Sequence, residues 1–312
     1  MRRYELAVYS YRLNIVDCGK VEMSDVQIHL GFDMGIRNLA YCLIEHCVDK
    51  KFKIIAWDNI DLLEGGTSAQ DAKACAGCKA AKASWISETD GKKWCNACAT
   101  RKRVKKTATD RPVLPTISCK LAVKPLREAV SSSGVESFVA SKMNKAALIA
   151  WARTRFLLPW KPEKASDASL DAVRRAMNVW LDSVLPTFAS ANLIRLENQP
   201  VMKGPTMKSV QIILYTLLAH RLEREYAWTG RIEFVHAGVK TAGAGAGAAT
   251  GDATSDATKA YRARKNAAET LTSEALRGSM AIEGEKWQKF FDGRRKKSDL
   301  ADAFLMALRA AR

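Results

Sequence analysis

Four carboxylates in the sequence stand where a strand pattern ends or a helical pattern begins. Asp33 ends the apolar alternation of residues 26–33, and Glu197 ends a second short apolar stretch. Asp299 and Asp302 lie three residues apart at the start of the last helical pattern, a spacing that puts both on one helix face. If the four converge, their repulsion requires hard cations, and two Mg²⁺ ions would balance their charge. Such a site predicts two-metal hydrolysis of a phosphodiester.

Each acid also has an ordinary structural interpretation. Asp33 suits a turn, because a glycine follows two residues later. Asp299 suits the first turn of a helix that a serine caps, and Glu197 can pair with one of many Lys or Arg residues. The combination is more specific than any member. The residues predicted to be catalytic and to bind two Mg²⁺ ions are Asp33, Glu197, Asp299 and Asp302.

Two Cys-x-x-Cys pairs form the second chemical feature. Cys75 with Cys78 and Cys95 with Cys98 flank residues 79–94, a spacing typical of a structural zinc site with four thiolate ligands and no open position. The surrounding segment is rich in Gly, Ala and Lys and lacks apolar periodicity, so we expect it to need the metal to fold. The other cysteines are scattered, which argues against disulfides and indicates an intracellular protein.

Two basic runs accompany these features, one after the cysteines at 101–106 and one before the last helix at 294–297. A charge run is usually a solvated surface. Beside a predicted zinc module in a chain of net charge +17, contact with DNA phosphates is the stronger interpretation. The residues in question are Arg101, Lys102, Arg103, Lys105, Lys106, Arg294, Arg295, Lys296 and Lys297.

The apolar pattern predicts an α/β domain built on a mixed sheet that positions these residues. Alternation predicts strands at 26–33, 39–44, 53–60, 192–197 and 231–236, the first three antiparallel. Helical spacing predicts helices near 139–159, 170–185, 206–226, 259–276 and 298–312. The predicted organisation is an N-terminal extension at 1–25, a nuclease core at 26–64 and 111–312, and a zinc-binding insertion at 65–110.

Composition limits the class of protein. The chain has 312 residues, 47% of them hydrophobic, which excludes global disorder. No apolar run approaches the roughly 18 residues of a membrane helix, and acids in the first 25 residues oppose a secretory or transit peptide. Lys and Arg number 50 against 33 Asp and Glu, an excess that indicates a polyanionic partner. We therefore expect an intracellular, non-secreted protein without membrane contact.

Three motifs resemble the successive catalytic motifs of the RuvC-like Holliday junction resolvases. They are LGFDMGIRNLA at 30–40, IRLENQP at 194–200 and KKSDLADAF at 296–304. The likeness covers most of the chain from Val26 onward and is greatest to the branch of poxviruses and other large DNA viruses, with fungal mitochondrial resolvases nearby. It implies a ribonuclease H-like fold, a homodimer, and cutting of four-way DNA junctions with Mg²⁺ or Mn²⁺. It also implies DNA contacts by Lys208, Lys240, Arg262, Arg264 and Lys265.

The sequence thus predicts a ribonuclease H-like mixed sheet flanked by helices, with an inserted four-cysteine zinc module, acting as a Holliday junction resolvase. Symmetric resolution needs two related nicks, which a two-fold dimer provides. One alternative is the RuvC-type nuclease of an RNA-guided transposon system, in which the zinc ribbon tends to follow the glutamate; here the cysteines precede Glu197. Another is a non-catalytic, zinc-containing junction-binding protein. For a viral source, the expected place of action is the site of viral DNA replication, in the host nucleus or cytoplasm.

Overall fold

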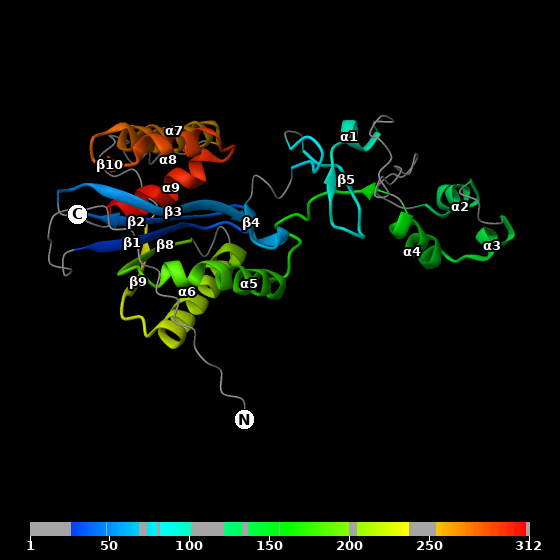
Figure 1. Ribbon diagram of the computed structural model, residues 1–312, viewed down its shortest axis with the longest axis horizontal. Coiled ribbons are helices and arrows are strands. Elements are labelled where there is room, and N and C mark those ends of the chain that lie inside the picture. Colours follow the sequence, from blue (N-terminus) through cyan, green and yellow to red (C-terminus); the bar gives the residue numbers. More distant parts are fainter. Residues whose placement is uncertain are drawn as a thin grey trace, which may run out of the picture.

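A mixed sheet of seven strands between two layers of helices forms the larger body of the protein (Figure 1). The computed structural model describes residues 26–47, 49–68, 74–79, 82–100, 122–132, 137–155, 157–199, 205–236 and 254–309. The strand order is β10-β3-β2-β1-β8-β9, with β4 paired to β3. The strands are β1 (Gln27–Asp33), β2 (Leu39–His46), β3 (Phe52–Asp61), β4 (Thr67–Ser68), β8 (Leu193–Glu197), β9 (Arg231–Val235) and β10 (Ala281–Ile282).

The predicted strands are confirmed, and their pairing explains the sheet. Strands β1, β2 and β3 form an antiparallel meander, whereas β8 pairs parallel to β1 and β9 parallel to β8. Parallel neighbours need crossover connections, which the helices between them supply. The result is the mixed α/β architecture that the apolar pattern predicts.

Helices cover both faces of this sheet (Figure 1). Helices α5 (Leu170–Phe188) and α6 (Pro205–Tyr226) pack on one face. The other face carries α7 (Thr254–Arg277), α8 (Gly284–Asp292) and α9 (Lys297–Leu308). None of the helices in the described part of the chain is both long and apolar enough to cross a membrane.

Aromatic rings fill both layers of the core. On the α5 side, Phe32 meets Trp180 and Phe188 edge-on, with ring centroids 6.4 and 5.7 Å apart. On the α9 side, Trp57 stacks on Phe291 at 5.4 Å. Such pairs stabilise the packing beyond their buried area. The sheet is therefore held rigidly on both faces, which fixes the side chains at its edges.

The cysteine segment belongs to a separate lobe that is larger than predicted. Its small sheet, β6-β5-β7, joins β5 (Trp85–Ile86) and β6 (Lys93–Trp94) to β7 (Leu158–Pro159), which comes far later in the chain. Leu158 and Ile86 share one apolar cluster with residues of the helices between them. The helices with residues in or next to this cluster are α2 (Val123–Ser132), α3 (Ser137–Lys142) and α4 (Lys145–Arg155); α1 (Asn96–Thr100) follows β6.

This packing moves the domain boundary. The sequence prediction assigns 111–312 to the nuclease core, whereas the described residues 122–159 pack with the cysteine segment (Figure 1). The apolar spacing of these helices is the same whichever core they contact, so the sequence pattern does not reveal their partner. The pairing of β7 with β5 shows that these helices pack with the cysteine segment.

Several predicted element boundaries differ from the structure. The helix expected near 139–159 is divided into α3, α4 and β7. Helix α5 passes Pro186 and ends at Phe188, because a proline in the last turn removes only one backbone donor. Helix α8 and the three-residue helix η1 (Leu62–Glu64) are not predicted, since each is short and lacks a long apolar period.

Burial of His29, toward the end of β1 opposite Asp33, makes the folding stability depend on pH. His29 lies beside His46, with ring centroids 4.5 Å apart. Burial, the His46 ring and the Arg195 charge lower the pKa of His29 from 6.5 to about 4. The unfolded chain therefore binds a proton that the folded protein does not, and stability falls as the pH drops from 6.5 to 4, by at most about 3 kcal/mol. Urea unfolding of the wild type and of His29→Leu at pH 7 and 4.5 measures this, and an equal pH dependence in both would contradict it.

Candidate functional site

Asp33 and Glu197 end two neighbouring parallel strands. In the β1–β8 ladder Phe32 pairs with Leu196, so the next residues along the two strands, Asp33 and Glu197, follow as neighbours. Adjacent strands are about 4.8 Å apart, and parallel strands end at the same edge of a sheet. Two predicted site residues that are far apart in sequence thus lie side by side.

Both acids project from the face of the sheet that α9 covers. Phe32 and Leu196 belong to the apolar cluster beneath α5 and α6. Because successive side chains in a strand alternate between faces, Asp33 and Glu197 point to the opposite face. Asp33 is buried there, with 9% of its surface exposed.

Helix α9 crosses β1 at Gly31 and runs antiparallel to it. A Cβ on Gly31 would lie 2.4 Å from the Ala303 carbonyl oxygen and 2.7 Å from the Ala307 nitrogen, so only a glycine allows this approach. The carbonyl oxygen of Ala307 lies 3.2 Å from Nε2 of His46, and His46 pairs with Gln27 at the end of the sheet where β1 begins. The first turn of α9 therefore lies toward the end of the sheet where β1 stops.

This crossing brings the remaining two acids to the same end. From Gly31 to Asp33 the strand rises about 6.6 Å, and from Ala303 back to Asp299 the helix rises about 6 Å. Asp299 thus lies at about the same height along β1 as Asp33. Asp302 comes one residue before Ala303, where the helix crosses the strand. The four predicted acids thus belong to segments that meet toward one end of the sheet, on the side that α9 covers. Among the described residues only the four cysteines are close enough to form a metal-ligating group, so the role of the acids as metal ligands stays a prediction.

Polar neighbours orient two of these carboxylates. Lys265 on α7 donates hydrogen bonds to Asp299 Oδ1 at 3.3 Å and to Ser298 Oγ at 3.1 Å. Ser298 Oγ in turn lies 3.1 Å from Asp299 Oδ1. The side-chain amide of Gln199 donates to Glu197 Oε2 at 3.1 Å. Lys265, implied only by the family resemblance, is therefore a direct neighbour of the acidic site.

Lys208 lies in the first turns of α6, close to the loop that follows Glu197. Its ammonium group donates to Asn198 Oδ1 at 2.8 Å and to Gln211 Oε1 at 3.1 Å, and it lies over the Phe234 ring. Phe234 pairs with Leu196, which belongs to the apolar cluster beneath α5 and α6, so these contacts hold the ammonium group on the face opposite the one from which Glu197 projects. A contact of Lys208 with DNA stays a prediction.

The basic run before α9 is partly engaged by the protein itself. Arg294 lies 3.5 Å from Asp58 and over the Phe290 ring, and Lys297 lies 3.0 Å from Asp292. Four other predicted DNA-binding residues are exposed, namely Arg262, Arg264, Arg295 and Lys296. The remaining six lie outside the described residues: Arg101, Lys102, Arg103, Lys105, Lys106 and Lys240.

The four cysteines of the lobe form a compact cluster. The Sγ atoms of Cys75, Cys78, Cys95 and Cys98 all lie within 4.8 Å of one another, and those of Cys78 and Cys95 are 3.9 Å apart. A Cβ on Gly77 would lie 3.2 Å from Cys98 Sγ, so a larger residue in the turn between the first two cysteines would crowd the cluster. The predicted set is thus brought together.

The protonation of these thiols is consistent with a cation site. Burial opposes ionisation of Cys75, but backbone hydrogen bonds from Cys95, Cys78 and Gly77 lower its pKa to about 6. Hydrogen bonding with Cys95 raises the pKa of Cys98 to about 12. Four clustered sulfurs ionise together only when a cation offsets their repulsion, and four thiolates are a donor set that Zn²⁺ prefers.

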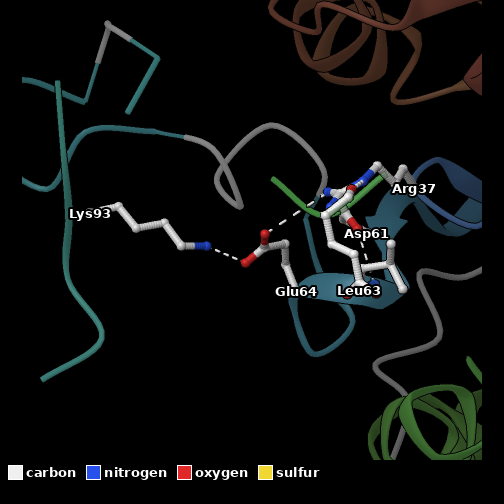
Figure 2. A network of polar contacts seen from close by, with 6 residues as sticks. Arg37, Asp61, Leu63, Glu64 and Lys93 are labelled. Carbon is white, nitrogen blue, oxygen red and sulfur yellow. Dashed lines mark hydrogen bonds and ion pairs between the residues drawn. The ribbon is translucent and has the colours of Figure 1, made fainter. Parts of the chain in front are cut away.

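An ion-pair network, which sequence reasoning did not find, attaches the lobe to the sheet (Figure 2). Arg37, in the turn after β1, pairs with the buried carboxylate of Asp61 at 2.6 Å and lies 3.9 Å from Glu64. Glu64 also binds Lys93 of β6. Arg37 follows Asp33 by four residues, so the lobe is attached at the acidic end of the sheet. Single charged residues in turns carry no periodic signal, which is why the sequence alone does not reveal the network.

Comparison with known proteins adds one structural likeness. The chain is similar to the yeast mitochondrial Holliday junction resolvase Ydc2, with a TM-score of 0.40 and 13% sequence identity over 91% of this chain and 78% of that one. No protein-family model and no curated protein matches the chain.

Proposed function

We propose that this chain is a divalent-metal-dependent DNA endonuclease with a ribonuclease H-like core. One observation carries the proposal: Asp33 and Glu197 end neighbouring parallel strands on one face, and α9 brings Asp299 and Asp302 to the same end. Carboxylates gathered at one edge repel one another unless hard cations such as Mg²⁺ or Mn²⁺ offset their charge. An oxygen-only donor set of this kind is typical of phosphodiester hydrolysis.

In this proposal the four carboxylates hold two ions, and the neighbouring residues keep them in place. Bound ions would activate a water and stabilise the leaving oxygen of the scissile phosphodiester. The parallel ladder fixes the separation of Asp33 and Glu197, and Gln199 orients one oxygen of Glu197. Lys265 holds Asp299 and carries a positive charge toward the position of the scissile phosphate.

We further propose that the substrate is a four-way DNA junction and that the chain acts as a homodimer. The motif resemblance to RuvC-like resolvases, including their large-virus branch, supports this substrate, and the net charge of +17 supports a polyanionic partner. A dimer supplies the two related active sites that symmetric nicking needs. The zinc lobe, attached at the end of the sheet that carries Asp33, would contact one arm of the DNA junction. The protein would act inside the cell. Its four cysteines would hold one structural Zn²⁺.

The experiment that tests the proposal compares a mobile four-way junction with linear duplex of the same sequence. We expect paired nicks in the junction with Mg²⁺ or Mn²⁺, none with EDTA, and little cutting of the duplex. Junction binding without cleavage under any divalent cation would instead support the non-catalytic alternative. Cleavage that appears only with an added guide RNA would support the RNA-guided alternative.

Lys265 should affect the rate of cutting more than binding. Lys265→Met is expected to lower the single-turnover cleavage rate about 10-fold or more and junction affinity less than about 3-fold, because charge at the scissile phosphate develops in the transition state. Arg262→Gln, one turn earlier on α7 and exposed, is the matched control and should weaken binding without slowing the step. Equal losses of rate and affinity in Lys265→Met would contradict this placement.

A further inference from the structure

Asn59 on β3 lies in the same cross-strand row as the acidic residues. Asp33 pairs with Ala40 on β2, and Ala40 pairs with Asn59. Directly paired residues point to the same face of a sheet, so Asn59 shares the α9 face with Asp33. Ala40 places only a methyl group between them, across a separation of about 10 Å between their Cα atoms. No sequence motif points to this asparagine.

The side chain of Asn59 is buried, and no residue in the described part of the chain forms a hydrogen bond with it. It is 5% exposed, and neither its Oδ1 nor its Nδ2 meets a donor or acceptor among the residues that the structure describes. Burying an amide in this way costs free energy, because the group loses its bonds to water. A buried amide on this face that no described residue satisfies indicates a partner other than those residues.

The first turn of α9 lies over β3 at Trp57, close to Asn59 along the strand. Trp57, two residues earlier on the same face, donates its indole N–H to the Leu300 carbonyl at 3.1 Å. Since β3 runs in the same direction as β1, the step from Trp57 to Asn59 leads toward the start of α9. Ser298 is buried there with 7% exposure. Asn59 therefore lies under the turn that carries Asp299.

We propose that Asn59 is a further residue of the metal site, whose amide hydrogen-bonds a water held by the cation at Asp33 and Asp299. The proposal rests on the metal site of the proposed function. An amide suits this place because it offers both a donor and an acceptor and leaves the charge balance of four carboxylates and two divalent ions unchanged. Residues that bind metal-held groups without binding the metal typically alter metal affinity or activity 10- to 100-fold.

The test uses the full-length, zinc-loaded protein and Mn²⁺ alone as the probe. Free Mn²⁺ is titrated by its paramagnetic resonance signal in wild type and in Asn59→Leu, which is similar in size but apolar. We expect Asn59→Leu to bind Mn²⁺ about 10-fold more weakly, with an unchanged or higher melting temperature in EDTA. Asn59→Asp, which restores an acceptor and adds a charge, should bind Mn²⁺ at least as tightly as wild type. Its metal-free form should melt lower.

Thr272→Val is the matched control. Thr272 on α7 is fully buried, and its hydroxyl also finds no partner among the described residues, but it lies about two helical turns beyond Lys265. Thr272→Val should keep wild-type Mn²⁺ affinity. Wild-type affinity in Asn59→Leu would overturn the role of Asn59 alone, whereas absence of Mn²⁺ binding by the wild type would overturn the metal site and the proposed function with it.

Discussion

Asp33→Asn is expected to slow junction cleavage about 1,000-fold or more while leaving junction binding within about 3-fold of wild type. The substitution keeps the size of the side chain and removes the charge that would hold a cation. It leaves the basic surface untouched, so the attraction to phosphates persists. Single-turnover cleavage with Mg²⁺ measures the rate, and gel-shift titration in EDTA measures the affinity.

A control with the same change of charge makes this result specific. Asp182 on α5 pairs with Arg221 at 2.8 Å, on the face of the sheet opposite α9. Asp182→Asn should cleave at the wild-type rate. If Asp33→Asn retained full cleavage, or if both variants slowed alike, Asp33 would not be a metal ligand.

Replacing Cys75 and Cys78 by serine together is expected to release zinc and to unfold the lobe while the seven-stranded sheet stays folded. The lobe has an apolar cluster of small extent, so binding of the metal supplies much of its folding free energy, about 10 kcal/mol or more for sites of this type. Elemental analysis should show zinc falling from one per chain to nearly none. Hydrogen exchange should show lost protection in residues 84–98.

The extent of unfolding tests the revised boundary of the lobe. Because β7 pairs with β5, loss of the cysteine cluster should also remove protection from residues 122–159. Cys47→Ser, at a cysteine outside the cluster, should keep both zinc and protection. Protection of 122–159 that survives zinc loss would mean that these helices fold independently of the cysteines.

The sequence predicts those features whose physical cause is local. Alternation of apolar residues predicts β1, β2 and β3, because side chains of a strand point to opposite faces every second residue. The spacing of the two Cys-x-x-Cys pairs predicts the cluster, because each pair closes within one tight turn. The three-residue separation of Asp299 and Asp302 likewise puts both on one face of α9.

Tertiary structure alone decides what depends on contacts between distant segments. The parallel register of β1 with β8 makes Asp33 and Glu197 neighbours. The close approach of α9 to Gly31 determines where along β1 Asp299 lies. Neither is encoded by a period within one element. The same holds for Asn59: its strand pattern is that of an ordinary sheet, and only the fold shows that it is buried with no hydrogen-bond partner among the described residues. Whether a buried polar group is satisfied depends on every segment packed around it, and that is a property of the folded chain.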